Sequence, residues 1–414
     1  MAESAEATSK IFKRGFGLKP LVQGELTEDY HSRLIEGIIQ RDYSLTVGDL
    51  TFRLAKAFGF CYGVDRSVDY AYEARKQFPD KALYLTAEII HNPRVNRRLM
   101  EMGVQFLSGP YHGAKRVEDL TPDDVVIIAA FGTSVEELAR IQKQGCTLVD
   151  TTCGSVVNVW KRVERYAGDG YTAIIHGNYK HEETQATASR VTQHHNGKYL
   201  IVWDKAETRQ VCDYIVRGGD KQQFMETFGK CFSAGFDPDR DLVRIGCANQ
   251  TTMLSSESAE IAEMLRQAMA QRYGEAALDQ HFRNFDTICS ATQERQDAVL
   301  ELIKEPLDLM VVIGGFNSSN TNHLCEITSK VVPTYHIDEV PCLLSRDQIR
   351  HKPFGQKETV VTDRWLPDGT VRIGITAGAS TPDRVIGEAI TRILTLRGHA
   401  APDEVLAPTP SASS

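Results

Sequence analysis

Three cysteines occupy the same kind of place in the sequence, between a short strand-like run and a helical pattern. Cys153 lies in the hexapeptide DTTCGS, Cys289 in the similar DTICSA, and Cys61 in the looser copy FGFCYG. The free N–H groups at a helix N-terminus stabilise a thiolate. Three such thiolates predict the ligands of an iron–sulfur cluster, and a four-iron cluster held by three cysteines leaves one iron open to substrate.

The alternative for these cysteines is that they are small apolar side chains at strand ends, as free cysteines commonly are. The chain has nine cysteines and no CxxC pair, which excludes the compact zinc-ribbon and ferredoxin patterns. An odd count and an N-terminus without an apolar signal stretch favour reduced thiols, so we expect a cytoplasmic protein. The remaining six are expected to be structural: Cys146, Cys212, Cys231, Cys247, Cys325 and Cys342.

Loops rich in hydroxyl and amide side chains follow several apolar runs. One loop contains Ser318, Ser319 and Asn320, and another contains Ser380, for which we expect a capping role shared with Thr381 at the next helix. Backbone N–H groups and hydroxyls of this kind suit a phosphate. Together these loops predict a diphosphate held mainly by neutral donors.

Histidines and a carboxylate recur in the same context. His91 and His181 both lie just beyond apolar runs, and Glu183 follows two residues after His181. Imidazoles and a carboxylate near a redox metal are what proton delivery to a reduced substrate requires. The sequence therefore predicts a proton-transfer role for this group, although a lone histidine is more often structural.

Short apolar runs alternate with helical patterns, which is typical of buried strands in an α/β protein whose strand-end loops carry the site. The expected strands are Leu83–Ile90, Val125–Ala130, Tyr171–Ile175, Leu242–Cys247, Leu309–Ile313 and Val371–Thr376. An amphipathic helix is also expected within Tyr30–Arg41. The strand–cysteine–helix repeat predicts three related α/β modules, the second enlarged around Lys205–Arg240. The expected division is an N-terminal extension (1–50), three α/β domains (51–149, 150–285 and 286–398, the third with a C-terminal return segment) and a disordered tail (399–414).

Composition and charge narrow the possible partners. The formal net charge is −8 and the pI is about 5.9, which argues against non-specific nucleic-acid binding and against an anionic membrane surface. No apolar run approaches the length of a spanning helix. We expect no nucleic-acid partner and no membrane association.

Eight stretches, in order along the chain, resemble the 4-hydroxy-3-methylbut-2-enyl diphosphate reductase family. The resemblance runs from about residue 52 to residue 395. The stretches are AFGFCYGVD (57–65), EIIHN (88–92), DTTC (150–153), HGNYKHEE (176–183), QTT (250–252), DTICSAT (286–292), NSSN (317–320) and TAGAS (376–380).

The resemblance implies a fold of three related α/β domains in a pseudo-threefold trefoil around one central [4Fe–4S] cluster per chain. The implied cluster ligands are Cys61, Cys153 and Cys289, the cysteines that the repeat singles out. The implied catalytic residues are Glu183 for proton transfer and Thr251 near the substrate alcohol. The implied diphosphate-binding residues are His91, His181, Ser318, Ser319, Asn320 and Ser380.

The implied reaction is the reductive dehydroxylation of 4-hydroxy-3-methylbut-2-enyl diphosphate to isopentenyl and dimethylallyl diphosphates, the last step of the non-mevalonate isoprenoid pathway. No GxGxxG nicotinamide motif follows a strand, so ferredoxin or flavodoxin is the implied electron donor. Two alternatives stay open, a [4Fe–4S] hydro-lyase of the aconitase type and a cluster-based redox sensor. The sequence does not specify the oligomeric state.

One position departs from the pattern of many bacterial members of the family. They carry histidine where this chain has Phe131, and that histidine helps to hold the diphosphate. Phenylalanine carries no charge and donates no hydrogen bond, so this chain must bind the diphosphate with one imidazole fewer. Phe131 and the long N-terminal extension together resemble the cyanobacterial and plastid branch of the family.

Overall fold

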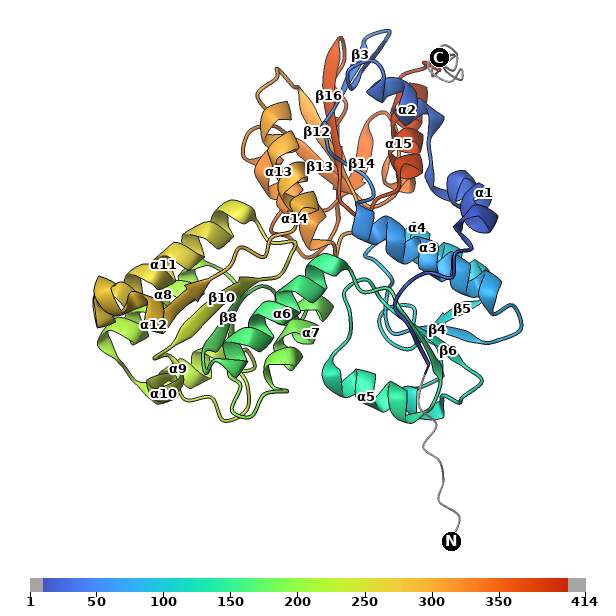
Figure 1. The fold of residues 1–414 in the computed structure, drawn as a ribbon. Helices are drawn as coiled ribbons and strands as arrows, with labels where there is room; N and C mark the ends of the chain where they lie inside the picture. The colour runs from blue at the N-terminus through green and yellow to red at the C-terminus, as the bar shows by residue number, and fades with distance from the viewer. Residues whose placement is uncertain (1–9, 401–414) are drawn as a thin grey trace, which may run out of the picture. The chain divides into compact units, whose positions relative to one another are not determined.

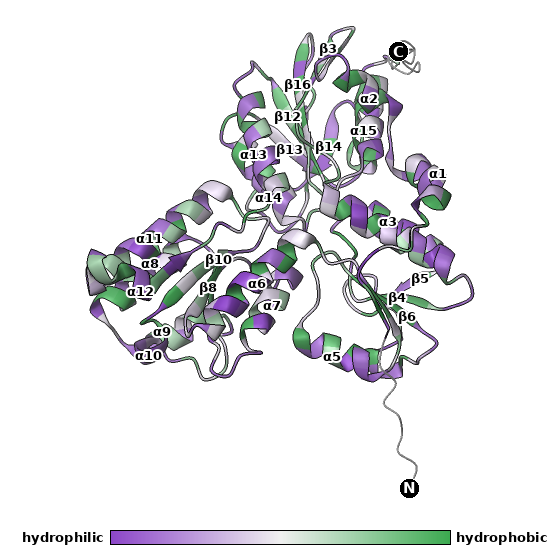
Figure 2. Cartoon of the chain, in the orientation of Figure 1, coloured by the Kyte–Doolittle hydropathy of each residue, from purple (hydrophilic) through white to green (hydrophobic). Residues whose placement is uncertain are grey.

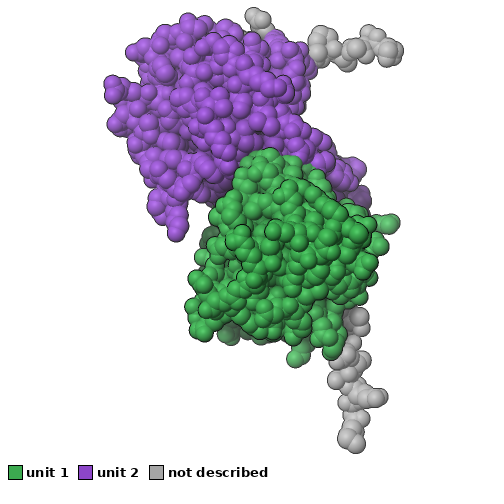
Figure 3. All heavy atoms as spheres, turned by 90° about the vertical axis from the view of Figure 1, so that its left-hand side faces the viewer, with its two compact units in different colours: residues 1–14, 80–89, 103–289 green, residues 15–79, 90–102, 290–414 purple. Residues whose placement is uncertain are grey.

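The computed structural model describes residues 10–400, and its helices and strands are labelled in Figure 1. The chain forms two compact units, coloured separately in Figure 3. Unit 1 comprises Met1–Arg14, Asp80–Ile89 and Gly103–Cys289, and unit 2 comprises Gly15–Pro79, Ile90–Met102 and Ser290–Ser414. The ends of the predicted N-terminal extension and C-terminal tail, residues 1–9 and 401–414, lie outside the described residues.

The first sheet of unit 1 is five-stranded and parallel, in the order β1-β7-β6-β4-β5. Its strands are β1 (Ile11–Phe12), β4 (Leu83–Leu85), β5 (Val104–Phe106), β6 (Val125–Ile128) and β7 (Thr147–Asp150). Because β4 and β6 are fully buried, they consist of apolar residues and are mostly green in Figure 2. Helix α5 (Val135–Lys143) contributes Ile141 to the core of this sheet.

The second sheet of unit 1 is parallel and has helices on both faces, in the order β11-β10-β8-β9. Its strands are β8 (Thr172–His176), β9 (Tyr199–Val202), β10 (Ile245–Asn249) and β11 (Phe282–Asn284). One core combines Ile174 with helices α8 (Lys205–Arg217) and α11 (Ser255–Tyr273). The other combines Ala173 and Ile175 with α6 (Gly154–Gly168) and α7 (Glu182–Val191), because successive strand side chains point to opposite faces. The predicted enlargement contains α8, α9 (Lys221–Phe228) and α10 (Pro238–Asp241).

Unit 2 is built on the sheet β13-β12-β16-β3-β2, parallel except for the β2–β3 pair. Its strands are β2 (Ser44–Val47), β3 (Leu50–Leu54), β12 (Leu309–Ile313), β13 (Thr334–Ile337) and β16 (Val371–Ala377). Helices α2 (Arg33–Ile39) and α15 (Asp383–Leu396) share one core with this sheet. The other helices are α1 (Lys19–Tyr30), α3 (Tyr62–Gln77), α4 (Pro93–Glu101), α13 (Ser290–Leu302) and α14 (Ser319–Ser329). A small antiparallel pair, β14 (Gln348–His351) and β15 (Val360–Asp363), completes the unit.

The prediction of a mixed α/β fold with several parallel sheets is confirmed, and each predicted apolar run coincides wholly or partly with a strand. The predicted amphipathic helix is present as α2. The expected cap at Ser380 or Thr381 is wrong. Helix α15 begins at Asp383 without a side-chain cap, and the two hydroxyls bond instead to the carbonyls of His91 and Ile313. The division into three domains stays a prediction.

Candidate functional site

The repeated DTxC segments of unit 1 form the same local turn. The Asp150 carboxylate accepts a hydrogen bond from the Thr152 N–H at 3.0 Å, and the Asp286 carboxylate accepts one from the Ile288 N–H at 3.0 Å. An aspartate that bonds to the backbone two residues later fixes a tight turn. The turn brings the cysteine that follows to the beginning of a helix, α6 in the first copy and α13 in the second.

Backbone hydrogen bonds hold each of the three cysteines in place, and all three are half-buried. In unit 1 the Cys153 N–H donates to the Ala130 carbonyl at 2.9 Å, and the Cys289 N–H donates to the Thr251 carbonyl at 3.2 Å. In unit 2 the Cys61 N–H donates to the Ala379 carbonyl at 3.1 Å, and Cys61 is the N-cap of α3. The three thiols therefore have the access and the helix-terminal position that a metal ligand requires.

The other cysteines differ in a way that argues against ligation. Burial raises the pKa of Cys146, Cys212 and Cys325 to about 11 each, and it raises the pKa of the fully buried Cys247 further. A thiol that stays protonated at neutral pH is a poor ligand and a poor nucleophile. Their environment matches the structural role expected of them.

Glu183 and Thr251 form the centre of the site in unit 1. Glu183 lies in the first turn of α7 and is 1% exposed. Its carboxylate accepts two hydrogen bonds from Thr251, from the N–H at 2.6 Å and from the hydroxyl at 3.0 Å. Because Thr251 also accepts the Cys289 N–H, the carboxylate, the hydroxyl and the cysteine belong to one connected group.

His181 joins this group at the N-terminus of α7. It is the N-cap, and its Nδ1 accepts the Glu183 N–H at 3.1 Å. An Nδ1 that accepts carries no proton, which leaves Nε2 as the N–H donor of the neutral ring. The Phe131 ring contacts the imidazole edge-to-face, with ring centroids 5.3 Å apart. Phe131, at which the sequence departs from the expected pattern, thus contacts one of the histidines predicted to bind the diphosphate.

The diphosphate-binding candidates of unit 2 form a second connected group. The His91 carbonyl accepts the Ser380 hydroxyl at 3.2 Å, and the His91 Nδ1 lies 3.1 Å from the Asn317 side-chain nitrogen. The side-chain oxygen Oδ1 of Asn320 accepts the Ala379 N–H at 3.0 Å. Ala379 therefore links this group to Cys61 through the backbone.

The beginning of α14 suits an anion. Ser318 is the N-cap, Ser319 is the first helical residue and Asn320 is the second. Asn320 is 2% exposed, and its side-chain nitrogen has no hydrogen-bond partner among the described residues. A buried donor of this kind is costly unless a ligand or water accepts from it, so it favours an anion at this helix terminus.

Sequence reasoning missed residues that position the cysteines and histidines. Arg295 is 4% exposed and donates to the Gly59 carbonyl at 2.7 Å, which fixes the segment before Cys61. Asn317 orients His91 in the same indirect way. Nothing in a single sequence marks an arginine within a helix as the partner of a distant carbonyl, because the partner is set by tertiary packing.

Gly59→Ala is expected to destabilise unit 2 and to lower its capacity to hold iron through Cys61. Gly59 has φ +75°, and an added Cβ would lie 2.5 Å from the Asp383 carboxylate. An alanine in this conformation costs about 1–2 kcal/mol before any clash is counted. Chemical denaturation and iron content per chain measure the effect.

Gly17→Ala is the matched control, because Gly17 has φ +72° but no atom within 4 Å of the added Cβ. This variant has the free-energy cost of an alanine at positive φ but no close contact of the added Cβ. Equal losses in both variants would show that the contact between residue 59 and Asp383 is unimportant.

Comparison with known proteins identifies the family of this chain. A family model described as LytB protein matches residues 52–394. The chain belongs to the LytB family. LytB relatives named 4-hydroxy-3-methylbut-2-enyl diphosphate reductase include one from Thermosynechococcus vestitus, 50% identical over 96% of this chain and 97% of the relative. Another, from Gloeobacter violaceus, is 50% identical over 94% of both chains. The predicted resemblance to the cyanobacterial branch is confirmed.

Solved structures of LytB-type reductases share the fold. A structure of the reductase described as the terminal enzyme of the non-mevalonate pathway is 28% identical, with a TM-score of 0.51 over 83% of this chain and 98% of the other. The reductase from Plasmodium falciparum, at 21% identity, matches with a TM-score of 0.60 over 83% of this chain and 87% of the other, which supports the fold alone. Among residues 10–400, no helix combines the length and the apolar character needed to cross a membrane.

Proposed function

We propose that this LytB-family chain reduces 4-hydroxy-3-methylbut-2-enyl diphosphate to isopentenyl and dimethylallyl diphosphates. The observation that carries the proposal is the buried Glu183 carboxylate, bonded twice to Thr251, which in turn is bonded to Cys289. Reductive removal of a hydroxyl group requires protons and electrons, and this connected group brings a carboxyl group and a hydroxyl together with a candidate ligand of an electron-carrying cluster. The names of the relatives support the same reaction.

Cys61, Cys153 and Cys289 are the proposed ligands of one [4Fe–4S] cluster. The donor set fits, because three half-buried free thiols each precede or cap a helix. A cluster so bound supplies electrons singly and a Lewis-acidic iron. No second set of cysteines with these properties occurs among the described residues.

The polar residues are proposed to bind and orient the diphosphate. Asn320 offers its buried N–H donor, Ser318 and Ser319 offer the N-terminus of α14, and Ser380 lies beside His91. His181 offers its Nε2 proton. Neutral donors bind the diphosphate without the desolvation cost of buried lysine or arginine side chains.

Glu183 is proposed to deliver the proton that accompanies loss of the hydroxyl group. The side-chain oxygen of Glu183 lies 3.0 Å from the Thr251 hydroxyl. When protonated, Glu183 can donate to Thr251 Oγ while Thr251 passes its own proton to the substrate hydroxyl, which leaves as water. General acid catalysis of this kind contributes about 10²–10⁴-fold to a rate. Burial of Glu183 and Thr251 keeps bulk water from competing for the proton.

The proposal includes a protein electron donor, ferredoxin or flavodoxin, because the sequence lacks a nicotinamide-binding motif. It also includes a reducing, cytoplasmic setting, which the nine free thiols support.

The experiment that tests this function is anaerobic turnover of the iron-loaded protein with chemically reduced viologen and the allylic diphosphate. We expect both five-carbon diphosphates. Conversion of substrate without consumption of electrons would identify a hydro-lyase instead. An intact cluster without any turnover would favour the redox sensor.

Phe131→His is expected to strengthen binding of the substrate diphosphate, because it restores an imidazole beside His181. A hydrogen bond to a charged group contributes about 1.5–3 kcal/mol, so KM should fall by about 10- to 150-fold. The gain should be larger at pH 6 than at pH 8, because a histidine side chain carries more positive charge at the lower pH. KM measured at both pH values checks this expectation.

Phe131→Leu is the control, because it removes the aromatic contact with His181 without adding a donor. An equal fall in KM for both variants would mean that relief of the ring contact, and not the imidazole, improves binding.

A further inference from the structure

A cavity outside the group around Glu183 lies at the carboxyl ends of β8 and β9. It has a volume of about 490 Å³. Gly177, directly after β8, and Trp203, directly after β9, are among the residues that line it. The segment from Thr227 to Cys231, which includes the last residues of α9, also lines the cavity and belongs to the enlargement of the second sheet. Cavities at this edge of a parallel sheet are common ligand sites, and this volume is typical of them.

The lining combines a buried apolar floor with exposed aromatic rings. Ile201 and Phe228 are 4% and 3% exposed, whereas Tyr179 is 37% and Trp203 is 46% exposed. The other two tryptophans of the chain are buried. Exposed aromatic side chains around one concave surface indicate a binding site for a ligand with an apolar part.

Two cations lie on the same cavity. Lys180 and Lys230 have no carboxylate partner within the described residues, in contrast to Lys205 and Lys221 of the same enlargement, which pair with carboxylates at 2.7 and 2.6 Å. The acid in the lining, Glu207, accepts the Trp203 N–H at 2.6 Å, and burial raises its pKa. The cavity therefore offers two ammonium groups to an anion beside an apolar surface.

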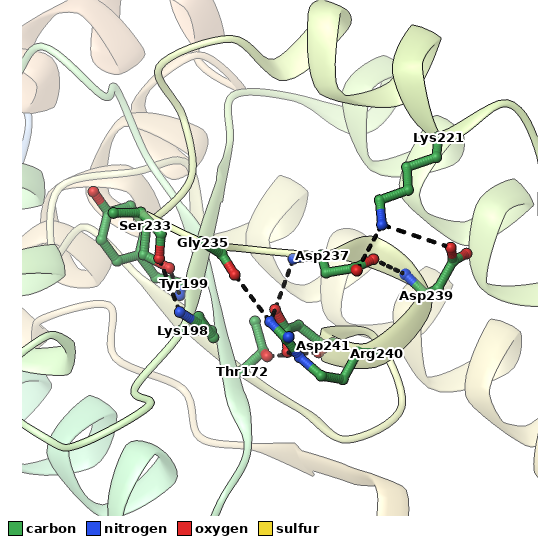
Figure 4. A network of polar contacts seen from close by, with 11 residues as sticks. Thr172, Lys198, Tyr199, Lys221, Ser233, Gly235, Asp237, Asp239, Arg240 and Asp241 are labelled. Atoms are coloured by element: carbon green, nitrogen blue, oxygen red, sulfur yellow. Dashed lines mark hydrogen bonds and ion pairs between the residues drawn. The ribbon is translucent and has the colours of Figure 1, made fainter.

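The walls of the cavity are fixed to the sheet. Two lining segments are joined directly, because the Ile201 N–H donates to the Cys231 carbonyl at 2.7 Å. Figure 4 shows contacts outside the lining that hold the chain beyond α9: Lys221 pairs with Asp237, and the Tyr199 N–H donates to the Ser233 hydroxyl at 3.2 Å. In the same network the Thr172 hydroxyl donates to the Asp241 carbonyl at 2.5 Å. A cavity held in this way is formed before any ligand arrives, which lowers the entropic cost of binding.

From this combination we infer a second ligand site, for a diphosphate ester of an unsaturated hydrocarbon chain longer than five carbons. The hydrocarbon lies on Phe228, Ile201 and the aromatic rings, and the diphosphate lies between Lys180 and Lys230. The inference rests on the proposed function, since the ligand shares the unsaturated hydrocarbon and the diphosphate of the proposed products. It gives the chain a site at which a later compound of the same chemical class binds.

Binding at this site is expected to slow turnover, because the loop between β8 and α7 contributes residues both to the cavity and to the group around Glu183. The Asn178 carbonyl accepts the His181 N–H at 2.9 Å, and the His181 ring accepts the Glu183 N–H at 3.1 Å. A ligand held by Tyr179 and Lys180 restrains the residues that orient Glu183. Coupling between two sites of this kind commonly changes affinity or activity by about 5–150-fold.

The test uses the full-length, iron-loaded protein and geranyl diphosphate as the probe. We expect a saturable change in Trp203 fluorescence, confirmed by calorimetry, that the five-carbon substrate does not abolish. Lys230→Ala should weaken binding at least about tenfold, since it removes a charge-assisted contact. Lys161→Ala, an exposed lysine on α6 outside the cavity, is the matched control and should bind as the wild type does.

Three outcomes would overturn the inference: unchanged binding in Lys230→Ala, displacement of the probe by the five-carbon substrate, or equal binding of inorganic diphosphate alone. Binding of the probe is measured without turnover, so its result does not depend on whether the proposed reaction occurs. In the turnover assay, the probe should lower kcat in the wild type and have little effect in Lys230→Ala.

Discussion

Replacement of Cys153 by serine is expected to lower iron content at least about tenfold and to abolish turnover, while the protein stays folded. Cys153 is the N-cap of α6, and serine is a favourable N-cap residue, so the helix keeps its start. The bond to the Ala130 carbonyl is made by the backbone and also survives. The loss is chemical, because a serine oxygen is a much poorer ligand for iron–sulfur clusters than a cysteine sulfur. Iron analysis and the visible absorption of the purified protein measure it.

The matched control for this variant is Cys212→Ala. Cys212 is also half-buried in unit 1, but it lies in the middle of α8 and burial raises its pKa to about 11. It should retain its iron and its activity. If Cys153→Ser kept a full complement of iron, Cys153 would have to be removed from the proposed ligand set.

Glu183→Gln is expected to leave iron content unchanged and to slow turnover by about 10²–10⁴-fold, the range for loss of a general acid. Glutamine keeps one oxygen to accept from the Thr251 N–H, and its amide nitrogen can donate to the Thr251 hydroxyl in place of the second bond, so the local structure has little reason to change. Its amide nitrogen carries no transferable proton at neutral pH. Single-turnover kinetics with pre-reduced protein isolates this step from electron delivery.

Glu136→Gln is the control for Glu183→Gln. Glu136 is likewise in the first turn of a helix, α5, but its side chain is exposed. It should react at the wild-type rate. Full activity in Glu183→Gln would assign proton delivery to another group, whereas a loss of iron in that variant would indicate a structural role.

Much of the fold is predictable because the information is local. Buried parallel strands are short and apolar, so the runs Leu309–Ile313 and Val125–Ala130 identify β12 and β6 directly. Pairing across the chain is not local. Strand β3 follows the N-terminal segment but pairs with β16, and no property of either strand specifies the other. The run Leu83–Ile90 is a strand only to Leu85, since hydrophobicity reports burial and not backbone conformation.

The candidate site likewise has features that the local sequence predicts and others that only the tertiary structure reveals. The repeat alone singled out Cys153 and Cys289, because the DTxC turn is a local structure with a local pattern. The bonds between Glu183 and Thr251 join residues far apart in sequence, so only the structure connects them. The contact of Arg295 with Gly59 has no sequence signal, because it depends on the packing of α13 against a distant loop.

The position of β3 beside β16 also constrains the order in which the protein can be made. The ribosome releases β2 and β3 before most of unit 1, but β16, the parallel neighbour of β3, is synthesised only after unit 1 has ended at Cys289. Unit 1 ends at Cys289, so its two sheets can form while the rest of the chain is still being translated. The Cys61 N–H finds its acceptor, the carbonyl of Ala379, only after the segment that follows β16 has been synthesised. The contact that holds Cys61 at the beginning of α3 therefore forms only after both sheets of unit 1 have been synthesised, so the proposed iron site at this cysteine is completed late in folding.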